Sequence, residues 1–321
     1  MKRHLKTKRF SSIHLVTLPP HHPVTPPDTL YSINGKIVPE SQALVPVTDR
    51  GFLYGDGLFE TMHAYGPMLF REKAHFERLL AGARTLHFDP LPDSKKLSAW
   101  LHETVAAAAF PEANARLTVT RGSGPRGPSI KGPFALNVVI TVTRHVRPPD
   151  ALLLQGVTAI VASLRRQESA VTAKLKTLNY IEQILARREA DLAGASEALL
   201  LNNAGLLCEG SASNISLIRD GKLTLPDPAL SGALPGIAQL TAVEAAHNLG
   251  IPTVYACLSP WDPAVADEAF LTGSMREISP LVRIGDQPAG GGKPGPLTLK
   301  IVKEFRRIVE RECAPFFFSR D

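Results

Sequence analysis

The stretch Ala198-Leu-Leu-Leu-Asn-Asn-Ala-Gly-Leu-Leu-Cys-Glu-Gly-Ser-Ala-Ser-Asn-Ile-Ser-Leu-Ile218 alternates short apolar runs with clusters of small polar residues. The runs at 198–201, 206–209 and 214–218 have the length of buried strands, and the clusters between them are typical of turns. Glu209 ends the second run and precedes a turn rich in glycine and serine. The stretch therefore predicts three consecutive strands with one carboxylate at the last turn.

Further elements are predicted on both sides of this stretch. A helix is expected over 235–249, because a proline stands in its first turn and Gly250 follows its end. The other elements predicted in this half of the chain are strands at 157–161 and 269–272 and helices at 180–192 and 296–313.

A different order of elements precedes residue 147. Tyr31-Ser-Ile-Asn-Gly-Lys-Ile-Val38 alternates around Asn34-Gly35, the strongest short signal for a hairpin. Helices are predicted at 73–87 and 95–109, and strands at 116–120 and 136–142, joined by a Gly/Pro/Arg loop.

The mixture of strands and helices on both sides of Arg147-Pro-Pro-Asp150 predicts two domains of α+β or α/β class. The predicted boundaries are an extension at 1–29, a small domain at 30–146, a linker at 147–150 and a large domain at 151–321.

The net charge of +6 is concentrated in the extension. Residues 1–29 hold five basic side chains, one acid and five prolines, so about +4 of the charge lies there and we interpret the extension as disordered. A plain extension is favoured over a mitochondrial transit peptide. The folded body, at about +2, shows no basic face with interleaved aromatic residues, and no apolar run reaches the ~18 residues of a membrane span. Nucleic-acid and membrane partners are therefore not expected.

The three cysteines, Cys208, Cys257 and Cys313, are widely spaced and form no CxxC. This usage favours a cytoplasmic protein and excludes a disulfide framework. The histidines show no paired ligand spacing, so no metal site is predicted. Gly290-Gly-Gly-Lys293 lacks the first glycine and the Ser/Thr of a phosphate-binding loop and is interpreted as a surface loop.

Several segments have the residue types that bind anions. Arginines flanked by glycines in Arg121-Gly-Ser-Gly-Pro-Arg126-Gly can grip a carboxylate or phosphate, although a solvated turn has the same composition. Pro235-Gly236-Ile237 opens a helix, where free N–H groups and the helix dipole favour an anion. Lys174 and Lys176 precede a helix among apolar neighbours that can lower a lysine pKa. Together with Glu209, these are the parts of a pyridoxal phosphate site.

Residues from about 33 to 286 resemble the class IV (fold type IV) pyridoxal phosphate enzymes, which include branched-chain and D-amino-acid aminotransferases and 4-amino-4-deoxychorismate lyase. The resemblance rests on six motifs in order. They are Asp49-Arg-Gly-Phe-Leu-Tyr-Gly-Asp-Gly-Leu-Phe-Glu60, His75-Phe-Glu-Arg-Leu79, Lys176-Thr-Leu-Asn179, Glu209-Gly-Ser-Ala-Ser-Asn214, Leu234-Pro-Gly-Ile237 and Thr272-Gly-Ser274. It implies the two-domain fold of D-amino-acid aminotransferases and a homodimer that completes each site.

The resemblance also implies a role for each matching residue. Lys176, rather than Lys174, would form the Schiff base with the cofactor and move the proton of the substrate Cα, and Glu209 would keep the pyridine nitrogen protonated. Arg78 would pair with the phosphate, and Tyr180 would lie near the phenolic oxygen. The remaining residues expected to bind the cofactor are Ser213, Asn214, Gly236, Ile237, Ala238, Gly273 and Ser274.

Two features of the sequence distinguish members of the family. The short spacing from Lys176 to Asn179 is typical of D-amino-acid aminotransferases and of the lyase, and the loop at 120–127 resembles that of aminodeoxychorismate lyases. This places the lyase first, with release of 4-aminobenzoate and pyruvate, and an aminotransferase for D-amino acids, branched-chain amino acids or amines second. Tyr54, Arg121 and Arg126 are the predicted substrate residues. A non-enzymatic anion-binding protein is the least favoured alternative.

Overall fold

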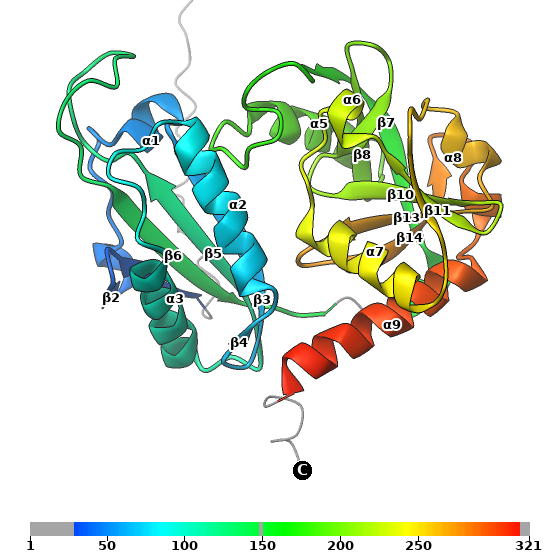
Figure 1. Ribbon diagram of the computed structural model, residues 1–321, viewed down its shortest axis with the longest axis horizontal. Helices are drawn as coiled ribbons and strands as arrows, with labels where there is room; N and C mark the ends of the chain where they lie inside the picture. The colour runs from blue at the N-terminus through cyan, green and yellow to red at the C-terminus, as the bar shows by residue number, and fades with distance from the viewer. Residues whose placement is uncertain (1–28, 148–149, 315–321) are drawn as a thin grey trace, which may run out of the picture.

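The computed structural model describes residues 29–147 and 150–314, which form two domains side by side (Figure 1). The two-domain α+β architecture of fold type IV enzymes is confirmed. The extension is predicted to be disordered, and its residues 1–28 lie outside the described part of the chain. Thr29 already begins the first strand, so the predicted boundary at residue 29 is one residue too late.

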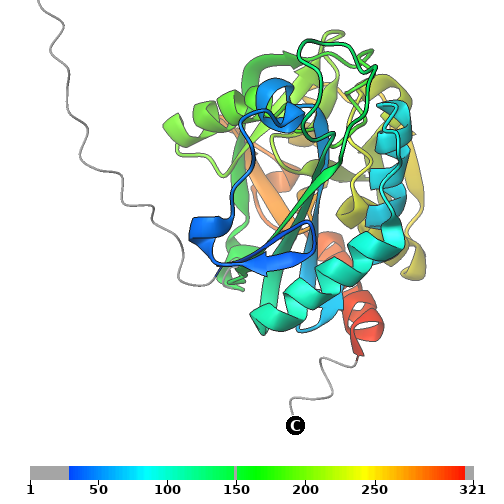
Figure 2. The ribbon, with the colours of Figure 1, turned by 90° about the vertical axis from the view of Figure 1, so that its left-hand side faces the viewer.

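The small domain is built on an antiparallel six-stranded sheet in the order β2-β1-β6-β5-β3-β4. Figure 2 shows the molecule with this domain toward the viewer. Its strands are β1 (Thr29–Ile33), β2 (Lys36–Val38), β3 (Gly57–Tyr65), β4 (Met68–Leu69), β5 (Glu112–Thr120) and β6 (Asn137–Arg144). The helices α2 (Glu72–Thr85) and α3 (Ser94–Ala108) pack on the sheet, and a short α1 (Arg50–Tyr54) precedes β3.

Side chains of β3 alternate between two environments, as the pleat of a strand requires. Leu58 and Met62 lie in the core that the sheet forms with α2 and α3. Phe59 and Tyr65 lie on the other face, where they contact Tyr180 and Glu277 of the large domain. This second face of the small-domain sheet is therefore one wall of the junction between the domains.

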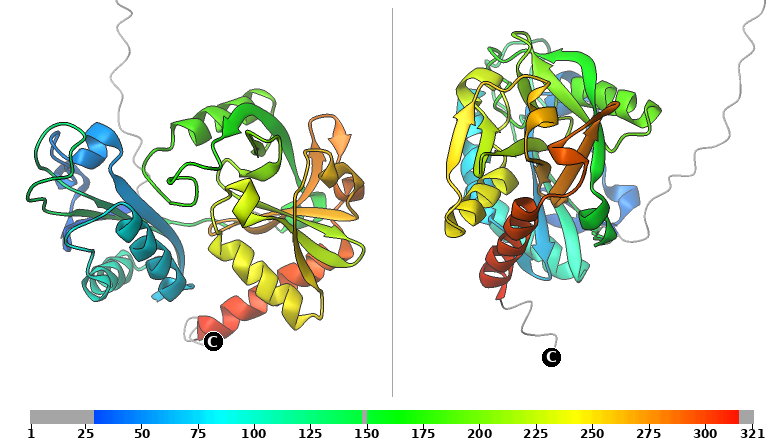
Figure 3. Two further views of the ribbon diagram at one scale, coloured as in Figure 1. Left: turned by 45° about the horizontal axis from the view of Figure 1, so that its top comes forward. Right: turned by 90° about the vertical axis from the view of Figure 1, so that its right-hand side faces the viewer.

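The large domain contains a nine-stranded mixed sheet in the order β12-β11-β10-β13-β14-β7-β8-β9, with β15 on β14. Its strands are β7 (Val157–Arg166), β8 (Glu197–Asn202), β9 (Leu207–Gly210), β10 (Asn214–Arg219), β11 (Lys222–Pro226), β12 (Thr253–Ala256), β13 (Glu268–Gly273), β14 (Glu277–Ile284) and β15 (Gln287–Pro288). Its helices are α4 (Ala151–Gln155), α5 (Ile181–Leu192), α6 (Pro228–Ser231), α7 (Ile237–Asn248), α8 (Asp262–Val265) and α9 (Pro296–Glu312). The helices α7 and α9 pack against each other (Figure 3). Among the described residues, no helix combines the length and apolarity needed to cross a membrane.

The predicted elements are present, with shifted ends. The helix predicted at 235–249 begins at Ile237, so Pro235 lies before the helix and not in its first turn as expected. Gly236 is the N-cap, and Gly250 adopts the left-handed conformation predicted for a residue after the helix end (φ 71°).

Asp56 holds two buried arginines of the small domain in place. Its Oδ2 accepts from Arg50 Nε and Arg121 Nε, both at 2.8 Å, and each arginine side chain is 4% exposed. Arg50 also donates to the carbonyls of Pro125 and Gly127, which ties α1 to the loop between β5 and β6. Burial raises the pKa of Asp56, but the hydrogen bonds from Arg121 and Arg50 outweigh burial and lower it.

We predict that Asp56→Asn lowers the free energy of unfolding by about 3–5 kcal/mol, because it leaves two buried guanidinium groups without their counter-charge. Urea titration at pH 7 measures this change. The difference from the wild type narrows in acid, because the native carboxylate is protonated as the pH falls through its lowered pKa. Asp93→Asn is the control, since asparagine also caps α3. Equal losses of unfolding free energy in Asp56→Asn and Asp93→Asn would contradict the role of Asp56 as the counter-charge of the two arginines.

Candidate active site

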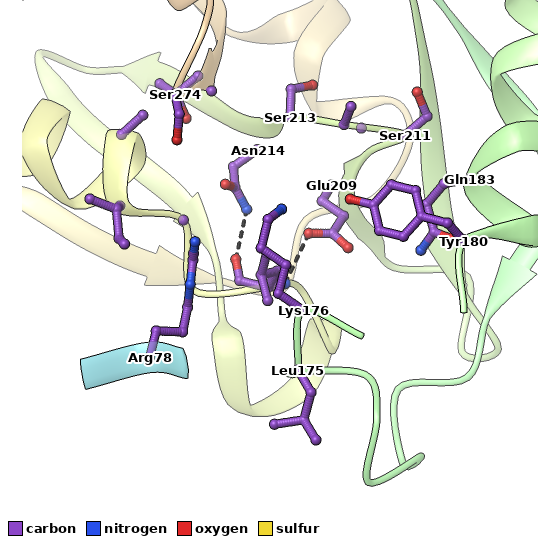
Figure 4. A pocket seen from close by; sticks show the side chains of 18 of the residues that line it. Arg78, Leu175, Lys176, Tyr180, Gln183, Glu209, Ser211, Ser213, Asn214 and Ser274 are labelled. Carbon is purple, nitrogen blue, oxygen red and sulfur yellow. Dashed lines mark hydrogen bonds between the residues drawn. The ribbon is translucent and has the colours of Figure 1, made fainter. Parts of the chain in front are cut away.

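A pocket at the domain junction gathers side chains from distant parts of the sequence (Figure 4). Its lining includes every residue predicted to bind the cofactor: Arg78, Lys176, Tyr180, Glu209, Ser213, Asn214, Gly236, Ile237, Ala238, Gly273 and Ser274. It also includes residues to which the sequence analysis assigned no role, among them Arg166, Gln183, Ser211 and Thr272. Lys174 does not line this pocket, and its side chain is exposed.

Lys176 is fixed between the two domains by its backbone. Its carbonyl accepts from the N–H of Phe59 at 2.9 Å, and the N–H of Leu178 donates to the carbonyl of Gly57 at 3.1 Å. The Nζ atom lies 4.5 Å from the centre of the Phe59 ring. Burial, followed by the nearby charge of Arg78, lowers the pKa of Lys176 to about 8. A substantial fraction of this lysine is therefore a neutral nucleophile near pH 8.

Arg78 reaches the pocket from α2 and is held by Glu60 of β3. Its Nε donates to Glu60 Oε1 at 2.8 Å and its Nη2 to Oε2 at 2.6 Å, which leaves Nη1 to donate to the Pro235 carbonyl. His75 contacts the same carboxylate at 2.7 Å. Burial opposes ionisation, yet the bonds from Arg78 and His75 lower the pKa of Glu60 to about 2. The guanidinium is thus positioned at the start of α7.

The start of α7 is open to an anion. No side chain caps this helix, and its first N–H groups have no acceptor within the helix. Gly236 lets the backbone approach closely, because a Cβ atom there would meet Asn214 Oδ1 at 1.8 Å. The buried Thr272 Oγ1, which also lines the pocket, has no hydrogen-bond partner in the described chain. A phosphate at this position would satisfy these donors.

Glu209 occupies the other end of the pocket. Its Oε1 lies 3.1 Å from Arg166 Nη1, and its Oε2 accepts from the N–H of Leu234 at 2.9 Å. Burial raises the pKa of Glu209, and Arg166 opposes that effect. Arg166 is anchored in turn by the carbonyls of Gly232 and Ala173. The carboxyl group therefore faces the pocket in a fixed orientation.

These groups fit pyridoxal phosphate. The open start of α7, Arg78 and the unpartnered Thr272 hydroxyl suit the phosphate, Glu209 suits a protonated pyridine nitrogen, and Lys176 suits the aldehyde carbon. The fit rests on an orphaned hydroxyl, a backbone cradle and a lysine of lowered pKa in one pocket.

The three predicted substrate residues lie outside this pocket. Arg121 is 3% exposed and donates to Asp56 and to the carbonyls of Leu86 and His87, so the prediction that it binds a substrate carboxylate is wrong. Its guanidinium stabilises the small domain instead. Tyr54 is 44% exposed and its hydroxyl accepts from the N–H of Gly127, while Arg126 is exposed on the same loop.

Arg116 is a residue that the sequence analysis did not select. It lies on β5 with its guanidinium carbon 3.7 Å from the centre of the Phe59 ring, the ring that Lys176 also contacts. It is half-buried, and its one hydrogen bond to a described residue, at 3.3 Å, goes to Thr118 Oγ1. No described carboxylate forms an ion pair with it. Its position at the start of a β-branched run was the only signal in the sequence.

The chain is similar to known proteins over most of its length. The family model "Amino-transferase class IV" matches residues 57–284. A putative branched-chain-amino-acid aminotransferase of Methanocaldococcus jannaschii is 35% identical over 278 residues, which cover 86% of this chain and 95% of the relative. A D-alanine aminotransferase of Listeria monocytogenes is 32% identical, with coverage of 90% and 99%.

A solved structure of 4-amino-4-deoxychorismate lyase from Pseudomonas aeruginosa is also similar. It has a TM-score of 0.78 and 32% sequence identity, and the match covers 87% of this chain and 98% of that one.

We predict that uptake of pyridoxal phosphate by the cofactor-free protein accelerates as the pH rises, with a midpoint near 8. The reason is that only the neutral form of Lys176 reacts, and this form increases through its lowered pKa. Stopped-flow absorbance of the bound cofactor measures the rate. Lys176→Ala should abolish the visible band, and Lys174→Ala, at an exposed lysine two residues away, should leave the rate unchanged. A midpoint near 10 would contradict the lowered pKa.

Proposed function

Because the chain belongs to the class IV aminotransferases, which use pyridoxal phosphate, we propose that it transfers amino groups between amino acids and 2-oxo acids whose carboxylate is held by Arg116. The observation that carries this proposal is the guanidinium of Arg116, which has no carboxylate partner in the described chain and shares the Phe59 ring with Lys176.

The chemistry divides between the cofactor and this chain. When bound, pyridoxal phosphate supplies an electron sink for negative charge that develops at the substrate Cα. Lys176 has the position and the lowered pKa to take the Cα proton and return it. Arg116 orients the substrate by its carboxylate, and the Phe59 and Tyr180 rings, edge to face at 5.2 Å, restrict water at that side.

A second candidate function is the lyase reaction on 4-amino-4-deoxychorismate. It is supported by the sequence of the loop at 120–127 and by the similarity to the Pseudomonas aeruginosa enzyme. The engagement of Arg121 with Asp56 removes one of the two arginines on which this assignment depended. For this reason we place the aminotransferase first.

We predict that Arg116→Met lowers kcat/KM for amino acid donors by about 100-fold, because a charge-assisted hydrogen-bonded pair to the substrate is lost. Activity toward an amine without a carboxylate should change little. Single-turnover bleaching of the cofactor band measures the reaction with three amino acids, D-alanine, L-leucine and L-glutamate, and with one amine, 1-phenylethylamine. Arg283→Met, on the exposed part of β14, is the control.

Two outcomes would overturn the proposal. If Arg116→Met lowers the activity toward amines and toward amino acids equally, Arg116 does not bind the substrate carboxylate. Release of pyruvate from aminodeoxychorismate without any 2-oxo acid, with no bleaching by amino acids, would replace the aminotransferase by the lyase.

We also propose a homodimer, in which the partner copy brings its Tyr54 and Arg126 loop to the pocket. Large apolar side chains on α1 and α5 support it: Phe52 is 71% exposed and Ile184 59%. An isolated chain would leave these side chains in water.

We predict that Phe52→Asp combined with Ile184→Asp yields a monomer by sedimentation velocity. Transaminase activity should fall at least 10-fold, because the pocket loses the partner's loop. Val265→Asp, at an equally exposed side chain on α8, should leave the mass unchanged. A wild-type protein that sediments as a monomer would refute the dimer.

A further inference from the structure

A second cavity, of about 260 Å³, lies at the domain junction outside the cofactor pocket. His63 and His145 reach it from the small-domain sheet and from the residue after β6. Arg276 and Arg306 reach it from the large domain, from the turn before β14 and from α9. The rest of its wall combines apolar residues, among them Leu153, Met275 and Val302, with the charged side chains of Arg147 and Glu277.

Four side-chain nitrogens at this cavity are buried and have no hydrogen-bond partner in the described chain. They are His63 Nδ1, His145 Nε2, Arg276 Nη1 and Arg306 Nε. His63 is only 2% exposed. Buried polar groups are normally satisfied, so four unsatisfied nitrogens in one cavity indicate a missing polar partner.

Other atoms of the two arginines already have partners, which fixes their position. Arg276 Nη2 lies 3.4 Å from Glu197 Oε2, and Arg306 Nη2 donates to Asp150 at 3.1 Å. The Nε of Arg306 lies 3.6 Å from Glu277, too far for a hydrogen bond. Each guanidinium therefore retains one N–H group that can donate a hydrogen bond to an incoming oxygen.

A metal ion fits this cavity less well than an anion. Ligand atoms of His63, His145 and Glu112 do lie within 4.8 Å of one another. However, both oxygens of Glu112 accept from Arg147, at 2.9 and 2.7 Å, and Oε2 also pairs with His63 Nε2 at 3.0 Å. A divalent cation there would meet the charge of Arg147 directly.

We propose that this cavity binds a small organic acid, with its carboxylate at the two arginines, beside the histidines, and its compact apolar body against Met275 and Val302. Such a ligand would bridge the domains, because the histidines belong to one and the arginines to the other. The residues suit a small monocarboxylate with a compact apolar body, which can be a substrate-like acid or an effector.

Shared lining residues connect the cavity to the cofactor pocket. A small cavity between the two shares His63 and Glu277 with one and Ser274 and Ala238 with the other. In addition, Glu197, the partner of Arg276, accepts hydrogen bonds from Ser211 and Ser213 of the cofactor pocket. Binding at Arg276 would therefore act on the wall of the active site.

The test is titration calorimetry of the cofactor-loaded enzyme with isovalerate, with the cofactor absorbance recorded in parallel. We expect one binding event that changes the absorbance and a second that does not. The second event should weaken at least 10-fold in Arg306→Leu and in His145→Phe, which alter opposite sides of the cavity. Arg283→Leu is the matched control on β14. Because binding needs no turnover, this test does not depend on the proposed reaction.

Kinetics separate the two sources of the acid. If the KM for the amino donor rises at constant kcat in Arg306→Leu and His145→Phe, measured without isovalerate, the cavity extends the substrate site. If isovalerate changes kcat in the wild type but not in these variants, the cavity is an effector site. The proposal is overturned if the second event is absent, if it persists unchanged in both variants, or if Zn²⁺ binds through His145 while isovalerate does not.

Discussion

The backbone hydrogen bonds between the segment 176–178 and β3 are the constraint on which the site depends. The N–H of Phe59 donates to the Lys176 carbonyl, and the N–H of Leu178 donates to the Gly57 carbonyl, so a segment of the large domain extends the small-domain sheet at one point. These bonds set the direction of the lysine side chain. They also place the Phe59 ring directly beside Nζ, where it contributes to the burial that lowers the lysine pKa.

The same strand supplies the next group of the site. Glu60 follows Phe59 and, because successive side chains of a strand point to opposite faces, it turns away from the lysine and toward α2. There it holds Arg78 with two hydrogen bonds and aims it at the start of α7. A buried carboxylate with its counter-charge thus fixes an arginine that would otherwise be a flexible surface side chain. Positioning of the lysine and of the phosphate site comes from adjacent residues of one strand.

The sequence predicted much of this arrangement but missed the strand that organises it. The hairpin at Asn34-Gly35 and the helices α2, α3, α5, α7 and α9 are confirmed, because each has a local signal. β3 was missed because both of its faces are buried and its apolar residues are interrupted by Glu60 and His63, so neither strict alternation nor a continuous apolar run is visible. β14, with Pro280 in its middle, gave an equally weak signal.

Charged residues were harder to assign than elements, since their partners come from distant segments. Arg121 and Arg126 stand in the same glycine-rich loop and have the same composition around them, yet Asp56 binds the first and leaves the second in solvent. Arg116 had no motif around it, and only its contact with the Phe59 ring, which Lys176 also contacts, indicates that it lies near the site. An arginine in a sequence signals a counter-charge without showing whether that charge belongs to the protein or to a ligand. The decision rests on whether a carboxylate of the chain can reach it, and that is settled by tertiary contacts alone.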